Sequence, residues 1–272
     1  MPELPEVETV CRGLNEIVPP EKHHIKKIEL GSKKLRQDFR PALIRKSHGQ
    51  KILGVQRKAK YLLFELENDY LLSHLGMTGS WRIEDSKGVH DHVRIFLNDG
   101  RILTYRDPRR FGQFDIIKKS ELEKDKRFVH LGPDPVKEEG FTGEYLYLKS
   151  RKRNITVKVL IMNQEIVVGV GNIYASEALY LAGIKPTKIS SRLKAKECDQ
   201  LVDAIKETLF EAIFCGGSTI SDFKNAGGSE GYFQNLFFVY GKDKEECFYC
   251  GTLIKSKILG GRNSFWCPKC QR

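Results

Sequence analysis

The start of the chain carries apolar residues at helical spacing. Four of them lie three or four positions apart and share one predicted helix face: Val7, Val10, Cys11 and Leu14. Pro5 suits the first helical position, where no backbone N–H is needed, and Glu6 follows in the first turn, where the helix dipole favours negative charge. A helix start explains the chain from Leu4 onward, but it assigns no role to Pro2 or Glu3.

The pattern then changes to short runs rich in β-branched and aromatic residues, separated by turn signals such as Asn98-Asp99-Gly100. These runs cover residues 24–30, 51–66, 70–83, 91–97 and 101–107. Short strands joined by tight turns predict an antiparallel sandwich or barrel.

Helical spacing returns in the second half of the chain. Residues 131–144 are rich in Pro, Gly and acidic residues, which is typical of a linker, and helical runs follow at 156–163, 172–183 and 191–214. Gly183 ends one predicted helix, and Gly216 and Gly217 follow another. We expect an α+β chain with an N-terminal domain at 1–135, a linker at 136–149, a helical domain at 150–237 and a cysteine-containing module at 238–272.

Composition narrows the class of protein. At about 150 residues per domain, a chain of 272 residues is expected to form two domains. A total of 46 Lys and Arg against 35 Asp and Glu gives a formal charge of +11, which points to an acidic partner, nucleic acid before an anionic membrane. No apolar run is long enough to span a membrane and no secretory signal is present, so we expect a reducing compartment and no membrane partner.

The positive charge is clustered in two segments. Residues 31–60 carry ten Lys or Arg against one acid, Asp38, and residues 149–158 carry five with no acid. Each run alone is typical of a solvated surface. Two such runs in a chain with a metal-binding pattern favour contacts to nucleic-acid phosphates.

Four cysteines near the C-terminus form two Cys-x-x-Cys pairs, with residues 251–266 between the pairs: Cys247, Cys250, Cys267 and Cys270. Four thiolates at this spacing predict one tetrahedral Zn²⁺ ion with no open position, and therefore a structural role. The other cysteines lack partners at such spacing and are expected to be buried thiols: Cys11, Cys198 and Cys215. Between the pairs, the sequence GGRNSF predicts a hairpin turn that carries Arg262 near its tip, where it is either a phosphate ligand or an ordinary exposed arginine.

A glycine-rich turn precedes the predicted helix that starts near Asn172, in the sequence GVGNIYASE. It lacks the Gly-x-x-x-x-Gly-Lys-Ser/Thr pattern, so we expect no nucleotide cofactor. Asn172 is then either a helix cap or a phosphate ligand at a helix start.

The sequence YRDPRRFG predicts a tight turn that presents Arg109, Arg110 and Phe111 together. Arginines next to an exposed ring are typical of a loop that holds phosphates while the ring wedges into a base stack. Met77, between two glycines in HLGMTGS, is a second candidate wedge. Core packing is the alternative for both apolar side chains.

These motifs together resemble bacterial formamidopyrimidine-DNA glycosylases, which act on 8-oxoguanine and cleave abasic sites. The resemblance rests on MPELPEVET, RKAKYLLFEL, HLGMTGS, HDHV, DPRRFG, LGPDP, GVGNIYASE, CGGST and the four-cysteine finger with GGR, which occur in the family's order over nearly the whole chain. The resemblance implies an N-terminal catalytic β-sandwich, a helix–two-turn–helix domain and a zinc-finger β-hairpin. It also implies a monomer that acts on damaged double-stranded DNA in the cytoplasm of a bacterium, at the nucleoid.

The resemblance also supplies a role for Pro2. In the family the initiator Met is removed, and the proline amine attacks the sugar C1′ to form a Schiff base, followed by β,δ-elimination. An α-amine has an ordinary pKa of about 7.7–8.0, so a useful fraction is neutral at neutral pH. Glu3 is implied as the general acid and Glu6 as a residue that orients it. Lys60 is implied in β-elimination, and Arg262 in δ-elimination and in contacts to the flanking phosphates.

The DNA-contact residues are also carried over by motif. The implied DNA contacts are His90, Arg109 and Arg153, with Lys158 near the damaged strand and Asn172 on the phosphate backbone of the DNA. Met77, Arg109 and Phe111 are implied to fill the gap that a flipped nucleotide leaves.

Three positions depart from the family pattern, namely Cys11, Asn163 and Ser221. None removes a catalytic group, but Ser221 lies in the loop that covers the flipped base, where a basic residue is common. Two alternatives stay open: an endonuclease VIII-like enzyme for oxidised pyrimidines, which Leu4 disfavours, and a non-catalytic zinc-finger protein that binds damaged DNA.

Overall fold

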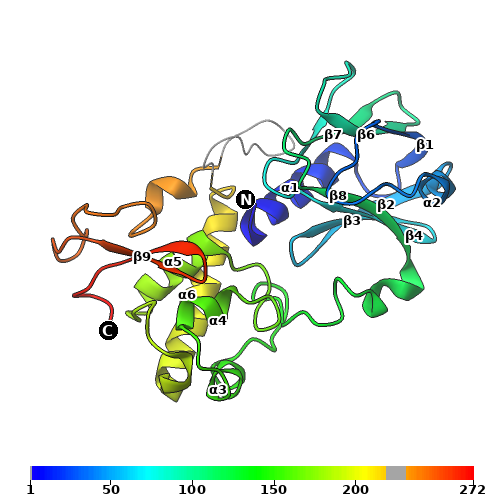
Figure 1. Ribbon diagram of the computed structural model, residues 1–272. Coiled ribbons are helices and arrows are strands. Elements are labelled where there is room, and N and C mark those ends of the chain that lie inside the picture. Colours follow the sequence, from blue (N-terminus) through cyan, green and yellow to red (C-terminus); the bar gives the residue numbers. More distant parts are fainter. Residues whose placement is uncertain (1, 219–230) are drawn as a thin grey trace. The chain divides into compact units, whose positions relative to one another are not determined.

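The computed structural model describes residues 2–218 and 231–272 (Figure 1). The chain divides into two compact units, one formed by Met1–Val129 with Cys215–Tyr232 and the other by His130–Phe214 with Phe233–Arg272. No helix in the described part of the chain is long and apolar enough to cross a membrane.

In its described residues, the first unit contains one long helix and eight strands. Its elements are α1 (Leu4–Ile17), β1 (His23–Leu30), α2 (Pro41–Ile44), η1 (Arg45–Ser47), β2 (Lys51–Lys58), β3 (Tyr61–Leu66), β4 (Asp69–His74), β5 (Ser80–Ile83), β6 (Asp91–Leu97), β7 (Ile102–Arg106), β8 (Gln113–Lys118) and η2 (Lys119–Lys124). The strands follow the order β5-β7-β6-β1-β2-β3-β4-β8, and the listed neighbours pair in antiparallel fashion. The predicted antiparallel architecture is confirmed.

The two ends of this strand order pack against each other. The Trp81 ring of β5 lies 5.0 Å from the Phe64 ring of β3 and 6.0 Å from the Phe114 ring of β8. Because β5 and β8 are the two edge strands, these contacts require the sheet to fold over a shared core. The structure is therefore the sandwich, not the barrel, of the two predicted forms.

Helix α1 begins one residue earlier than the sequence pattern indicates. Glu3 is the N-cap and forms a capping box with Glu6, so Leu4 is the first helical residue and Pro5 is the second. The predicted apolar face is confirmed, since Val7, Val10, Cys11 and Leu14 are all buried.

Strand β8 was absent from the sequence prediction. It is only six residues long, and Gln113 and Asp115 interrupt its apolar pattern. Its identity as a strand comes from six residue pairs with β4 that its own sequence does not reveal.

The second unit is a helical layer with a hairpin. Its elements are α3 (Gly143–Arg151), α4 (Val157–Met162), α5 (Asn172–Leu181), η3 (Ser190–Arg192), α6 (Ala195–Phe214), η4 (Phe233–Leu236), β9 (Lys255–Leu259) and β10 (Arg262–Trp266). The predicted helices are confirmed, and the β9–β10 hairpin lies beside α5 (Figure 1). The end of the expected linker 136–149 is helical, because the Thr142 hydroxyl caps α3 by accepting the Tyr145 N–H at 3.1 Å.

Candidate active site and nucleic-acid interface

The N-terminal segment is held by the carboxylate of Glu6. Its Oε2 accepts the backbone N–H of Glu3 at 2.8 Å, and its Oε1 accepts the N–H and the hydroxyl of Ser218 at 2.8 and 3.0 Å. Glu3 and Glu6 are both buried, at 4% and 2% exposed. A side chain at Gly217, where φ is +82°, would press on Glu6 Oε1 at 3.1 Å. This network holds Glu3 at the start of α1, and Pro2, the residue before it, is also buried.

A second contact joins α1 to the turn that carries Lys60. Glu8 Oε2 accepts a hydrogen bond from Arg57 Nε at 2.7 Å, and Arg57 Nη1 donates to the carbonyl of Ala59 at 2.9 Å. Ala59 has a φ of +52°, in the left-handed region, so this turn needs outside support. Sequence reasoning missed Glu8 and Arg57, because a charged pair 49 residues apart leaves no local pattern.

His74 lies beside this turn and is neutral at physiological pH. Burial, then the positive charges of Lys60 and Arg36, lower the pKa of His74 from 6.5 to about 4. Its Nδ1 accepts the Gly76 N–H at 3.0 Å, and its ring packs on Tyr61 at 4.8 Å. The histidine therefore supports the loop that leads to Met77.

The two candidate wedge residues are exposed. Met77 is 39% exposed and Phe111 is 46% exposed, so the core-packing alternative is wrong for both. The guanidinium of Arg109, another predicted DNA contact, stacks on the Phe111 ring at 4.8 Å. The loops approach closely, because a Cβ on Gly76 would lie 2.5 Å from the Gly112 nitrogen.

Asp107 holds these loops together. It is fully buried, and its carboxylate accepts the Thr78 hydroxyl at 2.6 Å and the Gly112 N–H at 2.8 Å. Its backbone N–H donates to the carbonyl of His90 at 3.0 Å. The carboxylate of Asp107 therefore positions the loops that carry Met77 and Arg109–Phe111, and its backbone N–H holds the segment of His90.

In the second unit, Lys158 joins two helices to the hairpin. Its ammonium is fully buried and donates to Asn172 Oδ1 at 2.7 Å, Ser264 Oγ at 2.9 Å and the Asn263 carbonyl at 3.2 Å. Asn172 is the first residue of α5, whereas Gly171 is its N-cap, so the cap interpretation of Asn172 is wrong. Asn172 Nδ2 also donates to the Asn263 carbonyl at 3.1 Å, beside the exposed Arg262.

The four predicted zinc ligands come together. The sulfur atoms of Cys247, Cys250, Cys267 and Cys270 all lie within 4.8 Å of one another. Individual Sγ–Sγ distances of 3.5 and 3.9 Å match the spacing of about 3.8 Å expected around a tetrahedral Zn²⁺. The set has thiolate donors only and no open position, so a bound zinc ion is structural.

The hairpin turn is also confirmed. Gly260 and Gly261 have φ values of +54° and +73° and connect β9 to β10, which begins at Arg262. Two glycines are required here because both central residues adopt the left-handed region. Arg262 is thereby presented at the tip of a hairpin that the metal stabilises.

Glu177 is a structural residue that sequence reasoning missed. It lies on α5, is 1% exposed, and accepts the N–H groups of Phe238, Val239 and Tyr240 at 2.7, 3.1 and 2.7 Å. Burial raises its pKa, and these three N–H groups oppose that effect. The carboxylate therefore anchors to α5 the segment that precedes the first cysteine pair.

The remaining predicted residues have less specific surroundings. His90 and Arg153 are half-buried, and Arg153 Nη1 donates to the Lys149 carbonyl at 3.2 Å. Cys11 is buried, with its thiol 3.2 Å from the Val55 carbonyl, and Cys198 is buried as predicted, whereas Cys215 is only partly buried. Ser221 lies outside the described residues.

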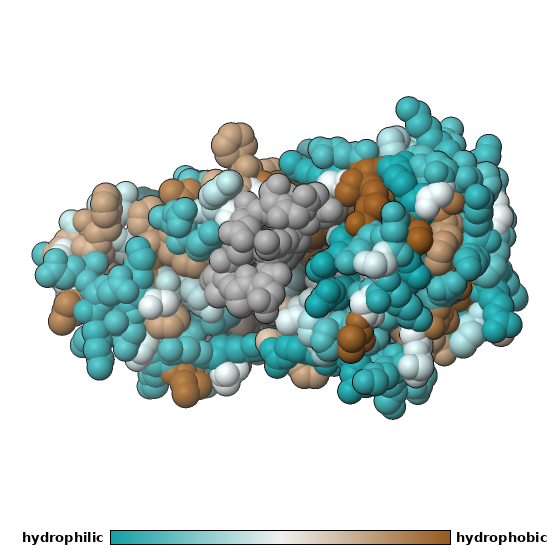
Figure 2. Space-filling model, turned by 90° about the horizontal axis from the view of Figure 1, so that it is seen from above, coloured by the Kyte–Doolittle hydropathy of each residue, from teal (hydrophilic) through white to brown (hydrophobic). Residues whose placement is uncertain are grey.

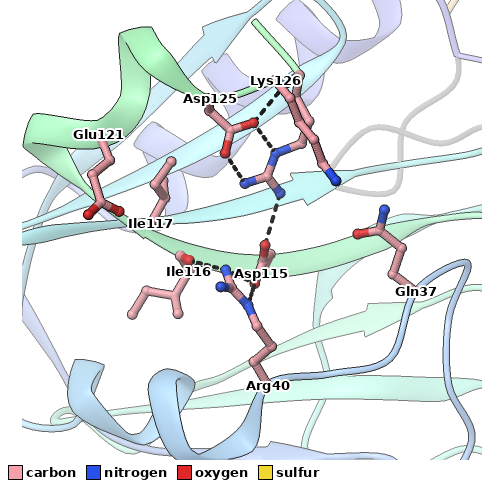
Figure 3. A pocket seen from close by; sticks show the side chains of 9 residues that line it. Gln37, Arg40, Asp115, Ile116, Ile117, Glu121, Asp125 and Lys126 are labelled. Carbon is pink, nitrogen blue, oxygen red and sulfur yellow. Dashed lines mark hydrogen bonds and ion pairs between the residues drawn. The ribbon is translucent and has the colours of Figure 1, made fainter.

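A separate pocket of about 320 Å³ lies in the first unit, lined by β8, by η2 with the residues after it, and by Gln37 and Arg40 from the segment before α2 (Figure 3). Asp115 accepts hydrogen bonds from Arg40 at 2.6 Å and from Arg127 at 2.9 Å, and Arg127 also pairs with Asp125. The charges of Arg40, Asp115, Asp125 and Arg127 are paired with one another, and none of the predicted site residues lines the pocket.

The exposed surface suits an acidic partner more than an apolar one. Figure 2 shows a mostly hydrophilic face on which hydrophobic residues form small, separate groups. Together with the charge of +11, this favours contacts to phosphates.

Comparisons with known proteins match the whole chain. Family models for the formamidopyrimidine-DNA glycosylase N-terminal domain and H2TH domain match residues 1–114 and 131–224, and a zinc finger found in FPG and IleRS matches residues 244–272. The formamidopyrimidine-DNA glycosylases of Bdellovibrio bacteriovorus and Glaesserella parasuis are 47% and 44% identical to this chain. They align with 100% of it and with 100% and 99% of their own lengths.

Solved structures agree with these matches. A Lactococcus lactis FPG mutant in complex with DNA containing Fapy-dG is 35% identical, with a TM-score of 0.90 and full coverage of both chains. The MutM (FPG) protein of Thermus thermophilus is also 35% identical, with a TM-score of 0.88 over 99% of this chain and 98% of its own.

Proposed function

Because the chain belongs to the formamidopyrimidine-DNA glycosylase family, we propose that Pro2 is the nucleophile of its reaction and that oxidised purines in duplex DNA are its substrates. The chain is a zinc-containing DNA glycosylase and AP lyase of base excision repair. The proposal concerns which residues perform this chemistry and on which bases.

The reaction begins when the neutral α-amine of Pro2 attacks C1′ and the base leaves with the electron pair of the glycosidic bond. The ammonium formed on Pro2 loses its proton, which neutralises the departing base. Glu3 in its acid form then protonates the sugar ring oxygen as the ring opens, and the freed nitrogen lone pair forms an iminium with C1′. The iminium acidifies the C2′ hydrogen, so loss of that proton expels the 3′ phosphate. A second elimination expels the 5′ phosphate.

The two hydrogen bonds from Ser218 to Glu6, at 2.8 and 3.0 Å, are the observation that carries this proposal. The bond from the Glu3 N–H to the other oxygen of Glu6 belongs to the capping box of α1, but the contact with Ser218, 212 residues away, is one that a simple helix start does not need. Ordered attacking groups lower the entropic part of a barrier.

Lys60 is proposed to assist β-elimination. The Glu8–Arg57 pair attaches the turn that carries Lys60 to α1, the helix that Glu3 caps. This attachment supports a place for Lys60 near the reacting sugar. Met1 lies outside the described residues, and its removal is part of the proposal.

The proposed DNA-binding roles rest on the exposure of these side chains and on the contacts that connect the loops carrying them. Met77, Arg109 and Phe111 are proposed to fill the space left by the flipped nucleotide, which offsets a cost of a few kcal/mol. Arg262 and Asn172 are proposed to hold phosphates flanking the lesion, with Arg262 also assisting δ-elimination.

Lys158 is proposed to act next to these phosphate contacts rather than at the surface, because its ammonium is buried among Asn172, Asn263 and Ser264. Arg153 and His90 complete the proposed backbone contacts. We also propose that the enzyme is a monomer and that it works at the bacterial nucleoid, where its DNA substrate lies.

Borohydride trapping tests the catalytic part. The mature protein is incubated with duplex containing 8-oxoguanine opposite cytosine and reduced with borohydride, and the adduct is mapped by peptide mass analysis. We expect a covalent complex through Pro2. A form with verified retention of Met1 is the matched control, because its proline nitrogen is an amide and should not trap. An adduct on an internal side chain would refute the mechanism.

The same assays, run with thymine glycol as well as 8-oxoguanine, distinguish the two alternative functions. Faster cleavage of thymine glycol than of 8-oxoguanine would support the oxidised-pyrimidine alternative. Tight binding of damaged DNA with no adduct and no cleavage would support the non-catalytic alternative.

A further inference from the structure

Tyr180 brings a hydroxyl group to the zinc-binding cysteines. It lies on α5, is only 5% exposed, and its hydroxyl oxygen lies 3.2 Å from Cys247 Sγ. Its ring stacks on Phe238 with centroids 5.2 Å apart and an interplanar angle of 22°. A buried phenol O–H in a mostly apolar cluster needs a polar partner, and the sulfur provides one.

The direction of this hydrogen bond follows from the metal chemistry. A zinc-bound cysteine is a thiolate and carries no proton, so the phenol must be the donor. Two positive charges of zinc against four thiolates leave a net negative charge in a site where Cys247 is only 2% exposed. Hydrogen-bond donors are therefore needed there, and the Cys270 N–H directed at Cys267 Sγ at 3.4 Å is another.

We propose that the Tyr180 hydroxyl donates a hydrogen bond to the zinc-bound thiolate of Cys247, and that this contact both retains the metal and positions the finger on α5. Outer partners of metal ligands orient those ligands and tune the charge on them. The family models and the cysteine geometry identify the metal site, but neither assigns a role to this hydroxyl.

The contact acts together with Glu177 on the same helix. The two residues are three positions apart, which places them on neighbouring parts of one helix face. Glu177 holds the N–H groups of Phe238 to Tyr240, while Tyr180 reaches the first metal ligand itself. Since α5 starts at Asn172, the metal site and a proposed phosphate ligand are attached to one rigid helix.

Tyr180→Phe tests the proposal, because it removes the hydroxyl and keeps the stacked ring. We expect zinc affinity, measured by competition with a chromogenic chelator, to fall about 10- to 100-fold, the usual effect of losing an outer partner of a metal ligand. Tyr249→Phe is the matched control. Its ring lies 6.3 Å from the Tyr180 ring and 6.1 Å from the Phe238 ring, but the residue is 69% exposed. The control should bind zinc like the wild type.

A spectroscopic readout separates this role from mere packing. In the Co²⁺-substituted protein, a hydrogen bond lowers the energy of the sulfur electrons, so Tyr180→Phe should move the sulfur-to-cobalt charge-transfer band to lower energy. Fluorotyrosine at position 180 is a stronger hydrogen-bond donor and keeps the packing of the ring, so it should move the charge-transfer band to higher energy. Unchanged zinc affinity and an unchanged band in both variants would overturn the proposal. Neither measurement depends on glycosylase activity.

Discussion

The carboxylate of Glu6 lies between the backbone N–H of Glu3, 2.8 Å from one oxygen, and Ser218, which donates two hydrogen bonds to the other. Ser218 is 212 residues away in the sequence, so one buried side chain connects the proposed nucleophile segment to a distant part of the same unit. A glutamine cannot replace this carboxylate, because it offers only one acceptor oxygen. In either orientation of the amide, its NH₂ group would face a donor, either the Glu3 N–H or Ser218.

We therefore expect Glu6→Gln to slow base excision about 10- to 100-fold, which corresponds to the loss of about 1.5–3 kcal/mol from a hydrogen bond to a charged group. The measurement is the single-turnover rate on duplex containing 8-oxoguanine. Glu16→Gln, an exposed change on the same helix, is the control and should leave the rate unchanged. A normal rate for Glu6→Gln would show that the network is not needed for catalysis.

Asp107→Ala should loosen the loops that carry Met77 and Arg109–Phe111. Removal of the carboxylate leaves the Thr78 hydroxyl and the Gly112 N–H without their acceptor. Because these loops are proposed to fill the vacated base stack, excision of 8-oxoguanine should fall about tenfold more than cleavage of a preformed abasic site. Equal losses on the two substrates would contradict this role. Asp38→Ala, an exposed change, serves as the control.

His74 predicts a stability loss in acid. Its pKa is lowered from 6.5 to about 4 in the folded protein, so between these values the unfolded chain binds more protons. Stability should be full above pH 6.5 and fall as the pH decreases toward 4, by about 1–3 kcal/mol for this partly buried group.

The comparison for this prediction is His74→Asn, whose Oδ1 can still accept the Gly76 N–H but does not titrate. Unfolding free energies of both proteins are measured by denaturant titration from pH 4 to 7. Their difference should change with pH, and a constant difference would contradict the assigned pKa.

Cys250→Ser should release zinc and weaken DNA binding together. The ion can contribute on the order of 10 kcal/mol to the folding of such a small unit, and the β9–β10 hairpin that presents Arg262 is part of it. Metal analysis and binding titrations measure the two effects. Cys198→Ala, at a buried cysteine outside the cluster, should keep full zinc. Full zinc in Cys250→Ser would refute the ligand assignment.

The sequence by itself determined the features that are written in local spacing. Two Cys-x-x-Cys pairs predicted the metal site, since a metal ion imposes its ligand spacing on a short segment. The sequence also predicted the apolar face of α1 and the hairpin turn at the two glycines before Arg262, because helix period and turn conformation are local properties.

Only the tertiary structure decided which polar groups share a buried position. Arg57 finds Glu8 49 residues away, Glu177 finds Val239 62 residues away, and Lys158 finds Ser264 106 residues away. Lys158 shows the reason most clearly. The sequence places Lys158 in a basic run that favours contacts to phosphates at the surface, but packing buries its ammonium, and a buried charge must then take whichever acceptors the fold brings to it. No local pattern records those acceptors, because they belong to other segments of the chain.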